Sequence, residues 1–299
     1  MSLTSTMFTG VSGLLNQAEG MSVIGNNIAN VNTIGFKGSR MLFSDVLSTT
    51  IGNIPVGQIG HGVQIQKVDT IFSQSSMETT TSPTDLAIQG NDFFAVAAPG
   101  TMTGPVTPTN AYYTRAGAFR LDNGSNPLGS ALITPDNYNV LDSAGNPIVF
   151  TPTYTSGANT LNFQKVISVS TMGEMSLLYA DNLGNSATVF YNGNGQPPIA
   201  TTPSVTVGTA KVPNPPGMVK LGGSLYRDTG VVTGGSGTPV FGKPNGSTEK
   251  IISSNLELSN VDLASEFVKM IQTQRAYSAN SKTITTADEM TQEVLNLKR

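Results

Sequence analysis

The sequence predicts an α+β fold in which paired N- and C-terminal helices, similar to a coiled coil, flank a discontinuous β-rich domain. Three observations predict it: an apolar stripe with helical spacing near the N-terminus, a near-heptad repeat near the C-terminus, and short β-branched runs separated by Gly, Pro, Thr and Asn between them. We expect residues 1–70 and 258–299 to form the helical domain, and residues 71–257 to form the β-rich domain.

Near the N-terminus, apolar residues recur at spacings of three and four, which is the pattern of one face of an amphipathic helix. Ser2 or Thr4 is suited to cap its start, and the turn-forming residues from Asn26 to Gly35 predict its end near residue 30. We expect the stripe to take part in self-association, through Leu3, Met7, Val11, Leu14, Ala18, Met21, Ile24 and Ile28.

A second long helix is predicted near the C-terminus. Asn260 is the expected N-cap, and Asp262 and Glu266 follow in the first turns, where the helix dipole favours acids. Apolar residues then step by four, three and seven before the stripe shifts, which is typical of a coiled coil with a stutter. The residues expected to take part in self-association here are Leu263, Phe267, Met270, Tyr277, Ile284, Met290, Val294 and Leu297.

Between the helices, short β-branched or aromatic runs indicate a β-rich body. These runs cover residues 62–72, 85–96, 111–121, 166–170, 186–191 and 204–207. Each helix must bury its apolar stripe, either against its own β-domain or against other molecules, and periodicity leaves both alternatives open. We expect both termini to be mobile in the free monomer and to become helical on assembly.

The composition narrows the function classes. The net charge of −3 gives no electrostatic reason to expect nucleic acid or an anionic membrane as a partner. Only 12% of residues are charged, which suits either a protein that packs against copies of itself or a secreted β-rich protein with a neutral polar surface. The chain contains no cysteine, which excludes disulfides and thiolate metal sites. We expect neither a cleavable signal peptide nor a membrane span.

No residue pattern indicates a reaction. His61 is the single histidine, so a multi-histidine metal site is excluded, and we expect it to lie in a loop or at a strand edge. Residues 237–243 have P-loop spacing, but Pro244 stands where Ser or Thr would bind Mg²⁺. Asp122, Asp136 and Asp142 lie among turn residues without the spacing of a calcium loop. We therefore expect no catalytic, cofactor-binding or metal site, and no enzyme.

Both ends of the chain resemble a known family. Residues 7–46 include the stretch Asn26-Asn-Ile-Ala-Asn-Val-Asn-Thr-Ile-Gly-Phe-Lys37, which is similar to the signature of bacterial flagellar rod and hook proteins. Residues 69–96, 113–120 and 259–299 are similar to further blocks of that family, whereas 125–255 show little likeness. The signature residues carried over are Asn26, Asn27, Asn30, Asn32, Gly35, Phe36 and Lys37.

Within the family, the C-terminal segment from Ile284 to Met290 is more similar to hook proteins than to the distal rod protein. The resemblance therefore implies a short-insert form of the flagellar hook protein, the flexible universal joint that passes motor torque to the filament for motility. The middle of the chain is short for a hook protein, so a second, inserted β-domain is expected to be absent or vestigial. This departure keeps the distal rod protein, part of a rigid drive shaft, as the alternative. Asp92, where Gly is expected, is a minor departure.

The resemblance also implies partners and a location. The terminal helices would form the polymerisation domain of a helical homopolymer, and the β-rich domain its outer layer. The expected partners are copies of the chain itself, distal rod, hook cap and hook–filament junction proteins, and the flagellar type III export apparatus, with no nucleic acid and no membrane insertion. The expected location is the hook or basal body of the flagellum, reached by export without a cleaved signal peptide.

Overall fold

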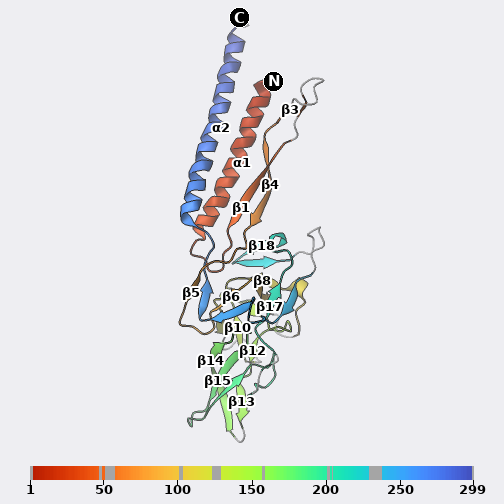
Figure 1. Cartoon of the computed structure of the whole chain (residues 1–299), viewed down its shortest axis with the longest axis vertical. Coiled ribbons are helices and arrows are strands. Elements are labelled where there is room, and N and C mark those ends of the chain that lie inside the picture. The colour runs from red at the N-terminus through yellow and green to blue at the C-terminus, as the bar shows by residue number, and fades with distance from the viewer. Residues whose placement is uncertain are drawn as a thin grey trace. The chain divides into compact units, whose positions relative to one another are not determined.

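The computed structural model describes residues 3–46, 49–50, 58–100, 104–122, 129–156, 159–200, 203, 205–228 and 238–297, with the backbone alone for 3–4, 49–50 and 58–59. Helices lie near both ends of the chain and strands fill the middle, which confirms the predicted α+β class (Figure 1). The chain divides into two compact units. The helical unit comprises Met1–Val31, Lys37–Ile71 and Val261–Arg299, and the strand unit comprises Asn32–Phe36 and Phe72–Asn260. The assignment of polymerisation to one part of the chain and an outer layer to the other stays a prediction.

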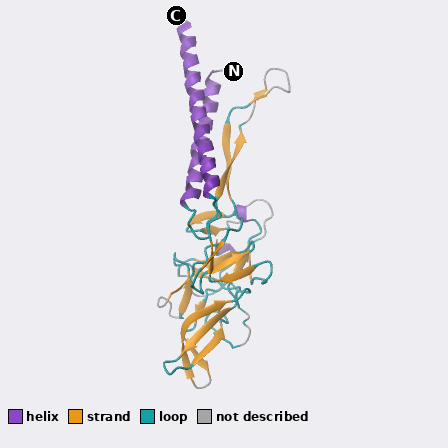
Figure 2. Cartoon of the chain, turned by 60° about the vertical axis from the view of Figure 1, so that its left-hand side comes forward, coloured by secondary structure: helices purple, strands orange, loops and turns teal. Residues whose placement is uncertain are grey.

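The helical unit is built on two long helices, α1 (Leu3–Ala29) and α2 (Leu263–Leu297), which lie side by side (Figure 1 and Figure 2). They run in opposite directions, because Gly10 of α1 lies against Ile284 whereas Gly20 lies near Thr273. The last turns of α2 extend past the start of α1 (Figure 1). Neither helix, within the residues described, is long and apolar enough to cross a membrane.

The end of α1 lies where it was predicted, but the N-cap of α2 is a different residue from the one expected. α1 ends at Ala29, as the turn-forming asparagines predict. The prediction of Asn260 as the N-cap of α2 is wrong, because its side chain donates to Ser73. Asp262 is the cap instead: its carboxylate accepts from the backbone N–H groups of Ala264 and Ser265 at 3.2 and 3.3 Å. The Ser265 hydroxyl also donates to this carboxylate. That bond first, and then the two backbone bonds, lower the pKa of Asp262, because they favour the charged carboxylate.

A long hairpin completes the helical unit. Its strands pair antiparallel along their whole length, with one bulge between Leu42 and Phe43. Asn16 of α1 fixes the hairpin by donating from Nδ2 to the carbonyl of Val63 at 2.7 Å. The strands are β1 (Ser39–Asp45) and β4 (Val63–Thr70), with the shorter pair β2 (Thr49–Thr50) and β3 (Gln58–Ile59) further along.

The main sheet of the strand unit has ten strands. Along its path they are β12 (Val149–Phe150), β10 (Ser130–Ile133), β11 (Asn139–Val140), β7 (Phe93–Ala97), β8 (Tyr112–Thr114), β19 (Leu225–Arg227) and β18 (Val219–Gly222). Off this path, β17 (Thr209–Lys211) pairs with β7 and with β20 (Val240–Gly242), and β9 (Arg120–Asp122) pairs with β10.

A second, four-stranded antiparallel sheet follows β12 in the chain. Its strands are β13 (Thr153–Ser156), β14 (Asn159–Val169), β15 (Met175–Ala180) and β16 (Ser186–Phe190). Two further pairs join segments far apart in sequence: β6 (Leu86–Gln89) with β21 (Lys250–Ser253), and β5 (Met77–Thr79) with β22 (Asn255–Glu257).

One hydrophobic core joins the ten-stranded and four-stranded sheets. Phe150 of β12 stacks on Phe163 of β14 with ring centroids 5.2 Å apart, and Phe163 in turn meets Tyr179 of β15 edge-on. The short runs predicted from the sequence coincide with strands, except the last. Of residues 204–207, Val207 makes only an isolated bridge to Asp142, so that part of the prediction is wrong for the described residues.

Candidate interaction surface

Small residues bring α1 and α2 into close contact. A Cβ at Gly10 would lie 2.8 Å from Cγ1 of Ile284, and one at Gly13 would lie 2.5 Å from Nδ2 of Asn280. Both distances are too short for a real Cβ, so a larger residue at either position would have to displace the facing side chain of α2. The contact between the helices therefore uses the glycine side of α1 and not its most apolar side.

Asn27 of the signature ties three elements of the helical unit together. Its Nδ2 donates to the carbonyl of Ser39 at 2.7 Å and to Oε2 of Glu266 at 3.2 Å, and its Oδ1 accepts from the N–H of Ser39 at 2.9 Å. Glu266 also accepts from Lys269 at 2.6 Å. One buried amide thus joins α1, β1 and α2, which gives a physical reason for asparagine at this position.

The outward side of α1 exposes large apolar side chains. Phe8 is 73% exposed, Leu15 is 65% exposed and Val11 is 41% exposed. They are spaced by three and four residues and so share one side of the helix. We call Phe8, Val11 and Leu15 the ridge. A monomer gains nothing from exposing such a stripe, and exposed contiguous apolar surface is typical of an interaction site.

The outward side of α2 is similarly apolar. Phe267 and Ile271 are about half exposed on adjacent turns near its start. Near its end the exposure rises to 87% at Leu297, where α2 extends past α1. The large apolar side chains exposed on α2 are Leu263, Phe267, Val268, Ile271, Tyr277, Met290, Val294, Leu295 and Leu297.

The structure distributes the residues expected to carry self-association over two sides of the helices. On α1, Val11 and Ala18 are exposed, Met7, Leu14, Met21, Ile24 and Ile28 are half-buried, and the Leu3 side chain lies outside the described residues. On α2, Met270 and Ile284 are half-buried, and the rest are exposed: Leu263, Phe267, Tyr277, Met290, Val294 and Leu297. Their role in self-association stays a prediction.

Sequence reasoning missed several exposed apolar residues because it followed one stripe per helix. Phe8 and Leu15 flank Val11 at spacings of three and four, so a second stripe was readable in the same segment. On α2, Val268 and Ile271 are displaced from the heptad positions in the same way. A helix that is apolar on more than one side has more than one neighbour to pack against.

A groove lies beside this helix pair, between α1, α2 and β1. It encloses about 470 Å³ and is walled by the apolar side chains of Val23, Ile24, Met41, Phe43 and Ile71. Gly20 forms part of its floor: a Cβ there would meet nothing closer than 3.8 Å. The groove is open because glycine leaves this position without a side chain.

The remaining signature residues lie around a tight turn. Gly35 has φ +65°, and a Cβ there would lie 2.4 Å from the backbone nitrogen of Ala116. Both the conformation and the close approach require glycine. The turn is held by the N–H of Gly35 donating to the carbonyl of Glu257 at 2.8 Å. Two segments that carried the family resemblance, 7–46 and 113–120, therefore meet here beside Glu257. Of the signature, Asn26 and Asn32 are exposed, Asn30 is half-buried, and Asn27, Gly35, Phe36 and Lys37 are buried.

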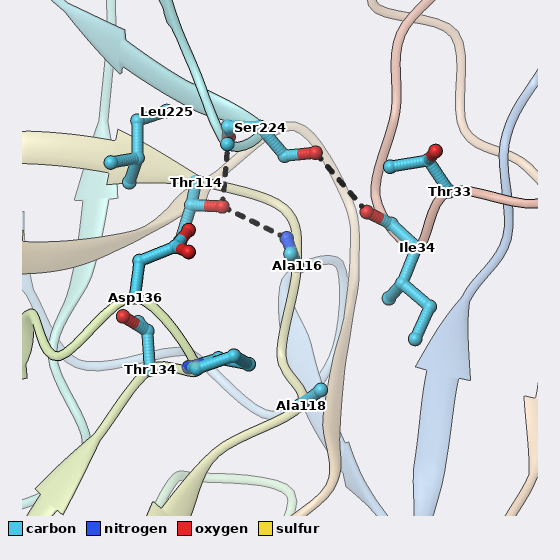
Figure 3. Close-up of a pocket in the computed structure, with 11 residues that line it drawn as sticks. Thr33, Ile34, Thr114, Ala116, Ala118, Thr134, Asp136, Ser224 and Leu225 are labelled. Atoms are coloured by element: carbon cyan, nitrogen blue, oxygen red, sulfur yellow. Dashed lines mark hydrogen bonds between the residues drawn. The ribbon is translucent and has the colours of Figure 1, made fainter. Parts of the chain in front are cut away.

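A small pocket of about 220 Å³ opens beside this turn, within the strand unit (Figure 3). The Ser224 hydroxyl donates to the carbonyl of Ile34 at 3.3 Å, and Thr114 bridges Ser224 and Ala116. Its acid, Asp136, is exposed. Figure 3 shows that Thr114, Ser224, Ala116 and Ile34 are already hydrogen-bonded to one another, so this side of the pocket has the character of a packed junction.

A buried ion pair stabilises the strand unit. The Arg115 guanidinium lies 3.4 Å from Oε2 of Glu257, donates to the carbonyl of Gly90 at 2.8 Å and lies over the ring of Phe93. Burial lowers the pKa of Arg115, and the Glu257 carboxylate opposes that shift. Asp92, the departure from the family pattern, is buried nearby, and burial followed by the charge of Glu249 raises its pKa. These charges support the fold and are inaccessible to a partner.

Chemistry-bearing residues do not gather elsewhere in the described part of the chain. No group of three or more acids or histidines that could hold a metal ion occurs among the described residues. His61 is exposed in the loop that precedes β4. Asp142 accepts from the N–H groups of Ala144 and Asn146 at 2.8 and 2.9 Å, which is turn chemistry. What the arrangement offers a partner is apolar surface on the helical unit.

Paired terminal helices with outward apolar stripes, joined by a β-rich middle, define a class of structural protein built to be packed against neighbours. Two family models match this chain: "Flagella basal body rod protein" over residues 7–37 and "Flagellar basal body rod FlgEFG protein C-terminal" over residues 252–297. The chain belongs to the flagellar rod and hook protein family, which confirms the resemblance seen in the sequence.

Several similar proteins are rod proteins. The flagellar basal-body rod protein FlgG of Bacillus subtilis is 36% identical over 304 residues, covering 98% of this chain and 99% of the relative. FlgG of Borreliella burgdorferi is 32% identical over 308 residues, covering 98% of each. The flagellar hook protein FlgE of the same organism is 26% identical over 454 residues, covering 98% of this chain and 99% of the relative. The comparisons therefore favour the rod alternative over the hook interpretation.

Proposed function

We propose that this chain is the distal rod subunit of the flagellar basal body, a structural protein that polymerises into a rigid drive shaft. The observation that carries this assignment is co-linearity with rod relatives: an alignment of 304 residues covers nearly all of both chains. The alignment to the hook relative spans 454 residues, so that protein has long segments with no counterpart in these 299 residues.

The exposed apolar stripes support polymerisation as the working activity. Burying them between copies removes apolar surface from water, which is the main driving force of protein association. In this proposal the terminal helices form the polymerisation domain and the β-rich part an outer layer, with no catalytic step. Its partners are copies of itself and the flagellar type III export apparatus. Hook cap and hook–filament junction proteins stay predictions.

Deletion of the gene in the source bacterium separates the two assignments. Basal bodies purified from the deletion strain and imaged by electron microscopy should carry shortened rods and no hook, and plasmid-borne wild-type chain should restore full-length rods. A hook subunit gives a different result, because its loss leaves the rod at full length. Full-length rods in the deletion strain would therefore overturn the distal-rod assignment.

The purified chain gives an independent test. Under polymerising conditions a rod subunit should form straight tubes, and a hook subunit should form curved ones. Curved tubes would contradict the proposal even if the deletion strain proved immotile.

A further inference from the structure

The groove of the helical unit has one charge that its own side chains leave unmatched. Glu266 and Lys269, which both line it, pair with each other at 2.6 Å. Arg40 lines the same groove and is exposed, and no carboxylate lies within ion-pair distance of it in the described part of the chain. Asp69, which lies opposite Arg40 in the hairpin, pairs with Lys67 instead. The groove therefore combines apolar and polar walls with one cation, Arg40, that is open to an acid from outside.

The ridge carries the complementary feature. Glu19 follows Leu15 by four residues, so it lies one turn further along the same side of α1. It is the only charged residue of α1, it is exposed, and no base pairs with it among the described residues. The ridge, three large apolar side chains followed by one acid, is therefore complementary to a groove that has apolar walls and one base.

Ridge and groove lie on opposite sides of α1. Val11 and Gly20 are nine residues apart, and at about 100° per residue this places them half a turn from each other. A chain cannot fold its own ridge into its own groove. In a pair of copies, the ridge of one can enter the groove of the other. The first copy then still has a free groove, and the second still has a free ridge. Such a head-to-tail contact is not self-complementary, so it can be repeated from copy to copy, and it generates an open polymer when the rotation between copies does not close a ring.

We propose that the ridge of one copy, formed by Phe8, Val11 and Leu15, seats in the groove of the next copy, with Glu19 facing Arg40. The occupant is a second copy of this chain, and the inference rests on the proposed function as a polymerising subunit. The groove volume of about 470 Å³ falls within the range of about 300–1,000 Å³ that takes ligands larger than one side chain. It therefore has room for more than one side chain of the ridge.

A charge exchange tests the pairing directly. Glu19→Arg and Arg40→Glu each place like charges at the contact, and each should raise the critical concentration for polymerisation of the full chain by about 3- to 10-fold. The double variant restores opposite charges, so its critical concentration should return to within about twofold of wild type. A double variant that is impaired as much as the product of the two single variants would overturn the contact.

Filling the groove gives a second test. Gly20→Leu introduces a side chain where a Cβ has at least 3.8 Å of clearance, so the variant monomer should keep the same circular dichroism spectrum as the wild-type monomer, and the new side chain should fill the groove. Gly25→Leu is the matched control, because no heavy atom lies within 4 Å of a Cβ there and the change in composition is the same. We expect Gly20→Leu to raise the critical concentration at least 10-fold and Gly25→Leu to change it less than threefold. Equal effects would refute the groove.

The absence of cysteine from the chain allows a direct readout of the junction. Mild oxidation of polymers of Leu15→Cys/Met41→Cys should give a ladder of disulfide-linked multimers on a non-reducing gel, whereas either single variant should give dimers at most. A closed two-fold pairing would stop the double variant at dimers and would contradict the head-to-tail contact. If the wild-type chain polymerises but the double-cysteine variant gives no ladder and the double charge variant shows no rescue, this contact alone is overturned. A wild-type chain that never polymerises and whose deletion spares the rod would sink the proposed function with it.

Discussion

Replacing Leu15 by alanine measures how much the exposed stripe contributes to association. The change removes three carbons, which are worth about 0.8 kcal/mol each when fully buried. Leu15 is 65% exposed in the monomer, so roughly 1.5 kcal/mol of this is gained only when a neighbour covers it. A loss of about 1.5 kcal/mol per contact corresponds to roughly a tenfold higher critical concentration.

The assay is sedimentation of the full chain over a range of concentrations, with thermal unfolding of the monomer measured in parallel. The monomer of Leu15→Ala should lose less than about 1 kcal/mol, since most of the side chain is already in water. Leu183→Ala is the matched control, because Leu183 is an exposed leucine of the strand unit. An unchanged critical concentration for Leu15→Ala, or the same rise for Leu183→Ala, would show that the stripe does not drive association.

Three further predictions concern the fold. Arg115→Met should lower the free energy of unfolding by about 3–5 kcal/mol in denaturant titrations, because Glu257 is left buried without its partner. Adding Glu257→Gln to this variant should recover part of the loss, and no recovery would argue against the ion pair. Burial raises the pKa of Asp142, so its contribution to stability is present at low pH and is lost as pH rises from about 4 through that raised pKa. Asp142→Asn should flatten this part of the pH profile, and an unchanged profile would refute the assignment. Amide exchange in the free monomer should be fast over residues 5–25, whereas strong protection there would contradict the expectation that this helix is completed by assembly.

Local patterns predicted the elements well where their cause is local. The spacing of apolar residues in α1 and the turn-forming asparagines after it predicted a helix that ends near residue 30, and it ends at Ala29. The start of α2 was harder to predict, because Asn260 and Asp262 are both good N-cap residues. Asn260 is not the cap because its side chain donates instead to Ser73, which is distant in sequence. Competition for a polar group between local and distant partners is invisible in a sequence.

The candidate surface was predicted in part. Periodicity identified apolar stripes on both helices, but the contact between the helices is made by Gly10 and Gly13, which carry no hydrophobic signal. The groove likewise depends on Gly20 and on strand β1, which reaches α1 through the Asn27 side chain. Both the helix contact and the groove exist because glycine has no side chain at these positions, and a hydropathy pattern does not reveal such positions.

By itself the sequence determined the two terminal helices, the β-rich middle and the family, because helix periodicity, turn chemistry and the signature near Gly35 are short-range properties of the chain. Only the tertiary structure decided which side of each helix is covered, that Arg115 meets Glu257 across 142 residues, and that ridge and groove lie on opposite sides of α1. The physical reason is that a side chain is buried only when a second surface covers it. A pattern shows that a side chain is apolar, but the partner that covers it is set by the path of the whole chain.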